Sequence, residues 1–229
     1  MNRRTIYFPH NFLVFTVLAL ILILVVGLIF MGVIGAAFED VGFSPTVTSL
    51  ILVITFIGSY FNIPILKLKT TIPMVKEGYV SFFGVVYRIP RVEYGEATTM
   101  VAINVGGALI PTFVSSYLLW KVPSALSNAL LGIAVVTVVT HAVARPVKGV
   151  GISTPVFIPP LVAALSAYIL PSSVPRVIAY VSGVLGTLIG ADLSNLNHIP
   201  KLGAPIASIG GAGTFDGVFL TGIVAVLLV

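Results

Sequence analysis

Two of the seven acidic residues lie inside apolar stretches that are long enough to be membrane helices. Asp192 lies in the segment Gly190–Asn195, and Asp216 follows the glycine-rich segment Gly210–Gly213. A carboxylate surrounded by hydrocarbon is energetically costly, so an acid inside a membrane span is a functional candidate by default. The remaining acids fall in predicted loops, where we interpret them as solvated charges: Glu39, Asp40, Glu77, Glu93 and Glu96.

Two facing carboxyl groups are the requirement for aspartic proteolysis. Like charges a few ångströms apart do not both ionise, so the pair shares one proton. The ionised member then activates water, and the protonated member polarises the peptide carbonyl. We therefore predict Asp192 and Asp216 as catalytic residues, and Gly211, Gly213 and Thr214 as residues that let a substrate backbone approach closely.

Depth in the membrane decides whether these two acids meet. If a helix starts at Ala204, Asp216 lies about 12 residues into it, roughly 18 Å at 1.5 Å per residue. Asp192 would then lie much nearer the cytoplasmic face. If Ile206–Gly213 is instead unwound, the last helix starts after it and the depths match. The glycines of Gly210–Gly213 favour the unwound arrangement.

Four more polar residues are expected at the same depth. His141 and Arg145 are four positions apart and so share a helix face, while Asn104 and Asn195 come from other spans. We expect Asn104 or His141 to orient a carboxylate, with Arg145 and Asn195 in support. A structural role is the alternative for each: an interhelical hydrogen bond for Asn104, a backbone partner for His141, a snorkelling charge for Arg145. The aspartates themselves fit a buried network with Arg145 or His141 as an alternative to catalysis.

The elements that position these residues are predicted to be membrane helices. Hydrophobic residues make up 58% of the chain and charged residues 8%, whereas soluble domains have about 25% charged residues. We predict an all-α integral membrane protein, a single polytopic domain over residues 1–229 with about seven transmembrane helices. The predicted spans are 11–36, 45–62, 98–120, 126–144, 153–170, 174–196 and 204–229. The second begins after Ser44-Pro45, a helix N-cap followed by a first-turn proline.

The distribution of lysine and arginine sets the predicted orientation. With the N-terminus in the cytoplasm, ten basic residues fall on the cytoplasmic side, and only Lys121 and Arg176 fall outside. Cytoplasmic loops carry the excess of positive charge in membrane proteins. The C-terminus is then outside. The net charge of +5 is scattered over short loops, so we expect no nucleic-acid partner. The chain contains no cysteine, which excludes disulfides and thiol catalysis; it also contains no glutamine, as is typical of thermophiles.

The longest predicted polar segment, residues 64–97, is expected to be a small cytoplasmic insertion. Aromatic and β-branched residues on both sides of Gly84, within Tyr79–Pro90, predict a β-hairpin. We interpret it as a cap that rests on the membrane, or as an exposed edge that pairs with an extended peptide. In the fifth span, Pro159-Pro160 breaks the hydrogen-bond ladder, so this span is expected to line a polar interior.

The arrangement of Asp192, the glycine motif Gly211–Gly213 and Asp216 resembles that of the intramembrane aspartyl proteases of the presenilin and prepilin-peptidase type. Those enzymes carry one aspartate on a sixth span and a second after a G-x-G-D motif. This sequence departs from the pattern, because two residues separate Gly213 from Asp216 and Ala191 stands where presenilins have tyrosine. The resemblance covers about residues 185–220. The whole chain also resembles an uncharacterised prokaryotic family of multi-span membrane proteins.

Three other functions are compatible with these residues. Glycine-interrupted helices at Gly106-Gly107 and Gly210-Gly211 are typical of an ion-coupled transporter. His141, His198 and the two aspartates offer zinc ligands, but their spacing matches no known zinc motif. The third is a non-catalytic membrane scaffold. For the protease we expect no cofactor, a multi-pass location in the plasma membrane, the lipid bilayer as partner and a membrane peptide as substrate.

Overall fold

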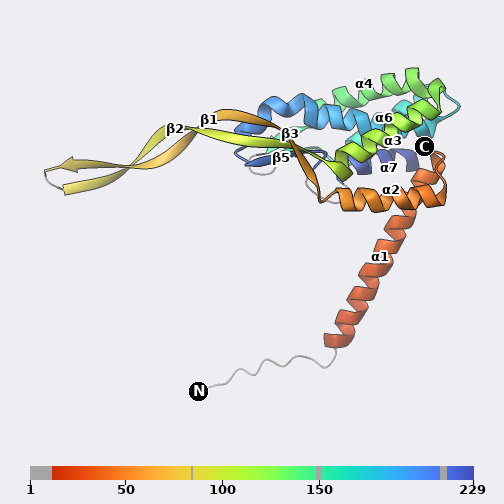
Figure 1. Cartoon of the computed structure of the whole chain (residues 1–229), viewed down its shortest axis with the longest axis horizontal. Helices are drawn as coiled ribbons and strands as arrows, with labels where there is room; N and C mark the ends of the chain where they lie inside the picture. The colour runs from red at the N-terminus through yellow and green to blue at the C-terminus, as the bar shows by residue number, and fades with distance from the viewer. Residues whose placement is uncertain (1–11, 84, 148–150, 212–215) are drawn as a thin grey trace.

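The computed structural model describes residues 12–83, 85–147, 151–211 and 216–229 of the chain (Figure 1). Seven α-helices and five β-strands lie within these residues. The α-helices are α1 (Phe12–Asp40), α2 (Pro45–Gly58), α3 (Ile110–Lys121), α4 (Leu126–Val143), α5 (Ile158–Ile169), α6 (Pro175–Thr187) and α7 (Gly217–Leu227). The strands are β1 (Asn62–Phe82), β2 (Val85–Asn104), β3 (Arg145–Val147), β4 (Gly151–Ser153) and β5 (Ile206–Ile209). Short helical turns complete the chain: η1 (Val105–Leu109), η2 (Pro123–Ala125), η3 (Leu188–Asp192) and η4 (Leu193–Leu202).

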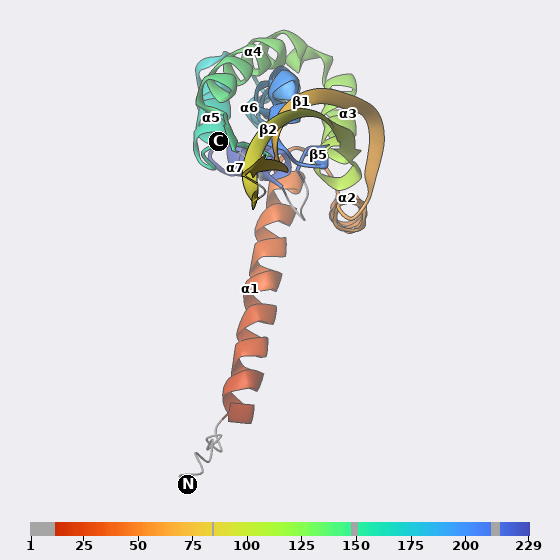
Figure 2. The same cartoon turned by 90° about the vertical axis from the view of Figure 1, so that its left-hand side faces the viewer.

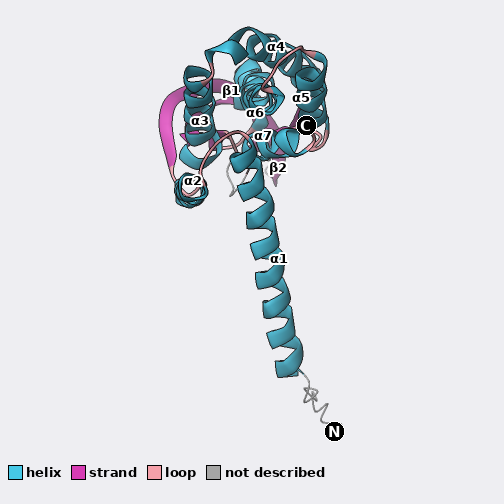
Figure 3. Cartoon of the chain, turned by 90° about the vertical axis from the view of Figure 1, so that its right-hand side faces the viewer, coloured by secondary structure: helices cyan, strands magenta, loops and turns pink. Residues whose placement is uncertain are grey.

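Helix α6 is the centre of the helical bundle. It contacts α3, α4, α5 and α7, which surround it when the bundle is viewed along its length (Figure 3). Its largest side chains are fully buried, among them Ile178, Tyr180 and Val184. Small residues allow this close approach, because a Cβ on Gly186 would overlap Val136 of α4 and one on Gly222 would overlap Val184. Helix α6, which leads toward Asp192, is therefore closely packed by the helices around it.

Helix α1 lies almost entirely outside this bundle. Figures 2 and 3 show it leading away from the other helices. Only its last turns reach the core, where Ile34, Ala37 and Phe38 are buried. Phe38 packs against the rings of Tyr180 and Phe219, with centroids 5.7 and 6.1 Å away. The rest of α1 exposes an apolar surface to its surroundings, as a lipid-contacting helix does.

Three helices in the described part of the chain are long and apolar enough to cross a membrane: Phe15–Asp40, Pro123–Val143 and Pro175–Pro200. Three further apolar helices, α2, α5 and α7, have 11 to 14 residues. At 1.5 Å per residue they reach about 17 to 21 Å, less than the roughly 30 Å of a hydrocarbon core. The chain is a membrane protein, but the prediction of about seven full-length spans is wrong.

The prediction of an all-α fold is also wrong, because β1 and β2 form a long antiparallel ribbon. Their pairing runs from Asn62↔Asn104 at the base to Phe82↔Val85 at the tip. The predicted hairpin around Gly84 is present, but it extends well beyond the expected 64–97 insertion. Residues 98–104, expected to open the third span, belong to β2 instead, and α3 starts only at Ile110. Thr98–Ile103 consists of β-branched and apolar residues, and periodicity does not distinguish a short buried strand of this kind from a helix.

The segment predicted as the seventh span also begins as a strand. β5 pairs in parallel with β2, with Met100 opposite Ile206 and Ile103 opposite Ile209. This pairing gives a three-stranded sheet of order β1-β2-β5 at the base of the ribbon. Ile206–Ile209 is therefore not helical, which agrees with the unwound alternative, and α7 begins at Gly217. The sheet base, β3 and the end of α6 all lie at one end of the bundle, opposite the end where α1 meets α2 (Figure 1).

Candidate functional site

A single glycine turn contacts both aspartates. Gly210 and Gly211 follow β5 and both have φ of +78°, a conformation that L side chains rarely adopt. The backbone N–H of Gly210 donates a hydrogen bond of 2.7 Å to Oδ2 of Asp192. On the other side of the turn, the carboxyl group of Asp216 packs directly on the Cα of Gly211, where any Cβ would overlap it. The turn therefore fixes the positions of the two acids relative to each other.

Asp192 is held where the central helix loses its regular form. α6 passes into the π-helical turn η3, which ends at Asp192, and then into the 3₁₀ helix η4. The carbonyl of Gly190 accepts hydrogen bonds from Ser194 Oγ at 2.6 Å and from Asn195 Nδ2 at 3.2 Å. Asn195 also donates to the carbonyl of Ala191 at 2.9 Å. Where the helix type changes, the carbonyls of Gly190 and Ala191 lose their regular backbone partners. The side chains of Ser194 and Asn195 supply the hydrogen bonds instead.

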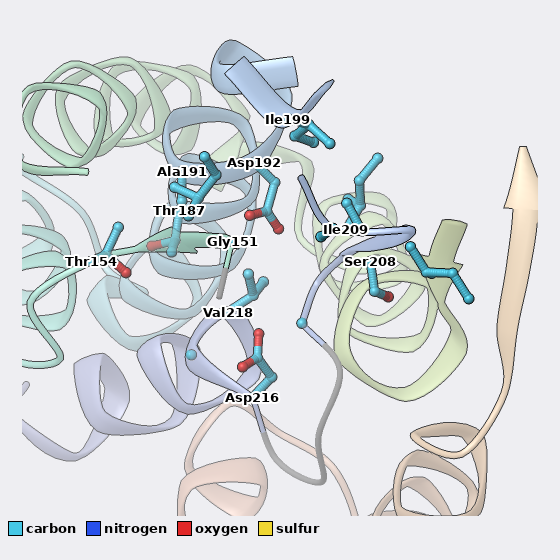
Figure 4. Close-up of a pocket in the computed structure, with 16 residues that line it drawn as sticks. Gly151, Thr154, Thr187, Ala191, Asp192, Ile199, Ser208, Ile209, Asp216 and Val218 are labelled. Carbon is cyan, nitrogen blue, oxygen red and sulfur yellow. The ribbon is translucent and has the colours of Figure 1, made fainter. Parts of the chain in front are cut away.

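Asp216 is held at the start of the last helix. It directly precedes α7, and its carbonyl accepts the first hydrogen bond of that helix, from Leu220 N at 2.9 Å. A carboxylate at this position faces the positive end of the helix dipole. The carboxyl groups of Asp192 and Asp216 both contact the Gly210-Gly211 turn. Figure 4 shows both groups directed into the same cavity.

The two acids line a cavity of about 200 Å³. Its walls come from the strand β4 with Thr154, from the end of α6 with η3 and η4, from the strand β5 and from the start of α7 (Figure 4). The lining residues are Gly151, Ile152, Thr154, Thr187, Ala191, Asp192, Ile199, Ala204, Ile206, Ala207, Ser208, Ile209, Gly211, Asp216, Gly217 and Val218. A water molecule occupies about 30 Å³ of liquid, so the cavity has room for several beside the carboxyl groups.

Asn104 lies outside the cavity, in a structural network. It is fully buried and caps η1, because its Oδ1 accepts from Gly107 N at 2.7 Å. Its Nδ2 donates to Ser59 O at 2.8 Å and to Asn62 Oδ1 at 3.2 Å. Ser208 of the cavity wall donates to the same Asn62 oxygen at 2.5 Å. Asn104 thus ties the end of α2, the ribbon base and β5 together and touches neither aspartate.

The other predicted supporting residues also surround the site rather than line it. His141 Nδ1 lies 2.8 Å from Ser194 Oγ, beside the turn that carries Asp192. Asn195 bonds to backbone carbonyls, as described above. Arg145 is exposed on β3 and lines a neighbouring hollow that shares Thr154 with the aspartate cavity. Gly213 and Thr214 lie outside the described residues.

Sequence reasoning missed two polar residues of the cavity, Thr187 and Ser208. Thr187 is 2% exposed, and its Oγ1 has no hydrogen-bond partner among the described residues. A buried hydroxyl without a partner is costly, and this one lies on the cavity wall. No sequence signal pointed to Thr187, because five residues along a regular α-helix rotate by about 140° and only the π-helical turn η3 brings it to the same cavity as Asp192. Ser208 had no signal either, because only the pairing of β5 with β2 brings it to the cavity.

A metal centre is not formed by the part of the chain that the structure describes. Those residues contain no group of three or more His, Cys, Asp or Glu side chains placed to hold an ion. His141 interacts with Ser194, and His198 is exposed on η4 and does not line the cavity. The zinc site considered from the sequence therefore lacks its ligand set.

The fold and the cavity define a membrane protein with a helical bundle, a projecting β-ribbon and a paired-carboxylate site. Residues 56–228 match a family described as a protein of unknown function, DUF1614. The chain belongs to this family, and the matched region contains the ribbon, the bundle around α6 and both aspartates. No curated protein and no solved structure matches the chain.

Proposed function

We propose that this protein is an intramembrane aspartyl protease whose catalytic dyad is Asp192 and Asp216. One observation carries the proposal: two carboxyl groups, one at the end of η3 and one directly before α7, face a single cavity and contact one glycine turn. Two carboxylates that were only surface charges would face solvent separately and would not line one cavity. The described residues also offer neither aspartate a salt bridge to a basic side chain, as a buried ion-pair network would require.

The two carboxyl groups would perform the reaction by exchanging protons with one water molecule. The ionised carboxylate takes a proton from the water as the water oxygen attacks the peptide carbon, and the protonated carboxyl donates its proton to the carbonyl oxygen. The resulting tetrahedral diol collapses when the newly protonated carboxyl group donates its proton to the leaving nitrogen, the other, now ionised carboxylate accepts a proton from one diol hydroxyl, and the C–N bond breaks. The products are a new carboxyl terminus and a new amine. The Gly210 N–H keeps Asp192 in place through these steps.

Strand β5 would hold the substrate in an extended form. β5 has only β2 as a neighbour among the described strands, so it stands at the edge of its sheet. All four residues of β5 also line the aspartate cavity. A peptide that adds to a sheet edge presents its backbone in the extended form that a protease needs. The substrate class is a membrane-embedded or membrane-proximal peptide whose helix has locally unwound.

An apolar vestibule would give such a peptide access from the lipid. A second cavity of about 180 Å³ lies between α5 and α7 and reaches Phe30 of α1. It shares Thr154 and Gly217 with the aspartate cavity, so the two spaces adjoin. Its other lining residues are Pro155, Val156, Phe157, Pro159, Pro160, Leu220, Thr221 and Val224. Apolar side chains of a membrane peptide would remain in apolar surroundings along this route.

The decisive experiment is cleavage of a single-span reporter peptide by the purified protein in liposomes. Asp192→Asn and Asp216→Asn keep the side-chain shape but remove the acid, so each should lower the rate by at least about 10²-fold. Glu96→Gln is the matched control, because Glu96 pairs with Lys69 at 3.9 Å on the exposed ribbon. It should leave the rate unchanged. A folded Asp192→Asn or Asp216→Asn protein that cleaves at the rate of the unmodified chain rules the dyad out.

The proposal includes a multi-pass location in the plasma membrane, with the N-terminus in the cytoplasm and the C-terminus outside. The aspartate cavity would then open toward the cytoplasmic side, together with the ribbon. The ends of the bundle support this orientation, because the segments rich in lysine and arginine gather at the end that carries the sheet (Figure 1).

An ion-coupled carrier is the second candidate, favoured by one observation. The two glycine pairs singled out in the sequence meet in space: the carbonyl oxygen of Gly210 packs on the Cα of Gly107, where a Cβ would overlap it. Glycine-broken helices that meet beside a carboxylate are typical of transport sites. Solute uptake into proteoliposomes that is lost in Asp216→Asn, with no cleavage of the reporter, would select this function over proteolysis.

A further inference from the structure

A groove of about 650 Å³ runs between α2 and α3, separate from the aspartate site. It shares no lining residue with the aspartate cavity or with the vestibule. Its walls are almost entirely apolar and aromatic. The lining residues are Gly42, Phe43, Ser44, Val47, Leu50, Ile51, Ile54, Ile110, Phe113, Val114, Tyr117 and Lys121. Binding sites for small molecules commonly have this size, with apolar walls and one or a few polar groups.

The groove exists because α2 packs mainly against η1 and makes little contact with α3. At that contact the backbone of Gly106 lies directly against Thr55 and Ser59, where a Cβ would overlap both. Further along, the space between the two helices is left open. Leu50, Ile54 and Phe113 are exposed along it. In a membrane protein these side chains face the acyl chains of the bilayer.

One end of the groove carries a positive charge without an acidic partner. Lys121 ends α3, and its Nζ donates a hydrogen bond of 3.0 Å to the carbonyl of Gly42. Within the described residues it forms no salt bridge, whereas Arg176 pairs with Asp40 at 3.5 Å. A lysine ammonium has three donor hydrogens, so two remain for a ligand.

Aromatic residues mark this end as the boundary between membrane and water. Trp120 is 78% exposed beside Lys121 and packs against Tyr117 with ring centroids 6.1 Å apart. Tyr117 in turn stacks on Phe43 with centroids 5.7 Å apart. Tryptophan and tyrosine are enriched at the level of lipid headgroups. The unpaired ammonium group is therefore at the depth where lipid phosphates lie.

We propose that this groove binds an anionic phospholipid. One acyl chain would lie along Ile51, Ile54 and Phe113, and the phosphate would accept hydrogen bonds from Lys121. The positive charge of Lys121 favours a lipid with an anionic headgroup, and the apolar walls of the groove fit its acyl chain. The lipid would fill the gap between α2 and the remainder of the bundle. This inference is independent of the proposed protease function, because the groove shares no residue with the aspartate cavity.

Native mass spectrometry of the full chain tests this proposal. The protein is exposed to equal amounts of phosphatidylglycerol and phosphatidylcholine with identical acyl chains, and the retained lipid is counted. The unmodified chain should retain phosphatidylglycerol in preference. Lys121→Gln should lower that preference about fivefold, the effect of one basic residue near a lipid surface. Arg176→Gln is the control on the same end of the bundle, and it should leave the preference unchanged.

A second variant tests the groove itself. Ile51→Trp places a larger apolar side chain in the groove and should reduce retention of both lipids while the preference set by Lys121 persists. Equal retention of the two lipids by the unmodified chain overturns the proposal. So does a Lys121→Gln protein with unchanged preference, or a peptide found in the groove in place of lipid. Because Lys121 is exposed, its substitution remains informative even if Ile51→Trp does not fold.

Discussion

At the scale of single residues, the site depends on two glycines, which have no side chain, as much as on the two acids. Gly210 offers its N–H to Asp192, and Gly211 leaves the space that the carboxyl group of Asp216 fills. Both glycines also have positive φ. A substitution in this turn therefore changes the local backbone energy and, at Gly211, the position of a proposed catalytic group.

We predict that Gly211→Ala abolishes reporter cleavage. The new Cβ would overlap the Asp216 carboxyl group, and alanine at positive φ costs about 1–2 kcal/mol. Gly203→Ala is the matched control, because Gly203 has φ of +73° but nothing within 4 Å of an added Cβ. It should lose a similar amount of stability and keep its activity. Thermal unfolding and cleavage rates measured on both proteins separate the two effects, and equal activity in the two would contradict the geometry of the turn.

At the scale of elements, the β-ribbon divides into a base that builds the site and an outer part that does not. The base pairs with β5 through Met100–Ile103 and buries Val101 completely. The outer part projects away from the bundle (Figure 1). It exposes large apolar side chains, including Val75 and Tyr94. A two-stranded ribbon by itself is only marginally stable in water, so the outer part adds little to the stability of the bundle.

We predict that the outer ribbon is dispensable for folding and for cleavage. Ile72 and Gly95 are register partners, so residues 73–94 can be replaced by an Asn-Gly turn that closes a shorter hairpin. The melting temperature should change by less than about 3 °C. Val101→Ala is the contrasting variant and should destabilise the protein by about 1–3 kcal/mol, because it empties space in the core. A shortened protein that folds but no longer cleaves would assign the outer ribbon a role in substrate binding.

At the scale of the whole molecule, the bundle has two chemically different ends. One end carries the sheet, the aspartate cavity and most of the basic residues. The other carries the connection between α1 and α2, the η2 turn and the C-terminus (Figure 1). Positive charge stays on the cytoplasmic side of a membrane, so this asymmetry supports the proposed orientation with a cytoplasmic N-terminus.

We predict that the two ends are labelled from opposite sides of the membrane. The chain contains no cysteine, so a single cysteine reports on one position only. Ser81→Cys near the ribbon tip and Ser124→Cys in η2 both replace exposed serines. A membrane-impermeant maleimide applied to intact cells should label Ser124→Cys alone, and both after permeabilisation. Labelling of Ser81→Cys alone in intact cells would reverse the orientation.

The sequence by itself determined the features that depend on local composition. The apolar runs of α1, α4 and α6 identified a membrane protein, because the free energy of transferring a helix into lipid is a sum over the residues of that one segment. Ser44-Pro45 fixed the start of α2, where Ser44 does cap the helix. The residues on both sides of Gly84 predicted a strand pair. The cost of a buried carboxylate singled out Asp192 and Asp216, and the two do line one cavity.

The tertiary structure alone decided the features that depend on partners distant in the chain. Thr98–Ile103 and Ile206–Ile209 suit a helix or a strand equally well. Thr98–Ile103 becomes a strand because it pairs with β1 on one side and with β5 on the other, and Ile206–Ile209 becomes one because it pairs with β2. The same pairing brings Ser208 to the cavity and ties Asn104 into the ribbon base instead of a carboxylate. Hydropathy is a sum over neighbouring residues, whereas β5 pairs with a part of β2 that lies about a hundred residues earlier in the chain. For that reason the membrane class followed from the sequence, and the mixed fold and the walls of the site did not.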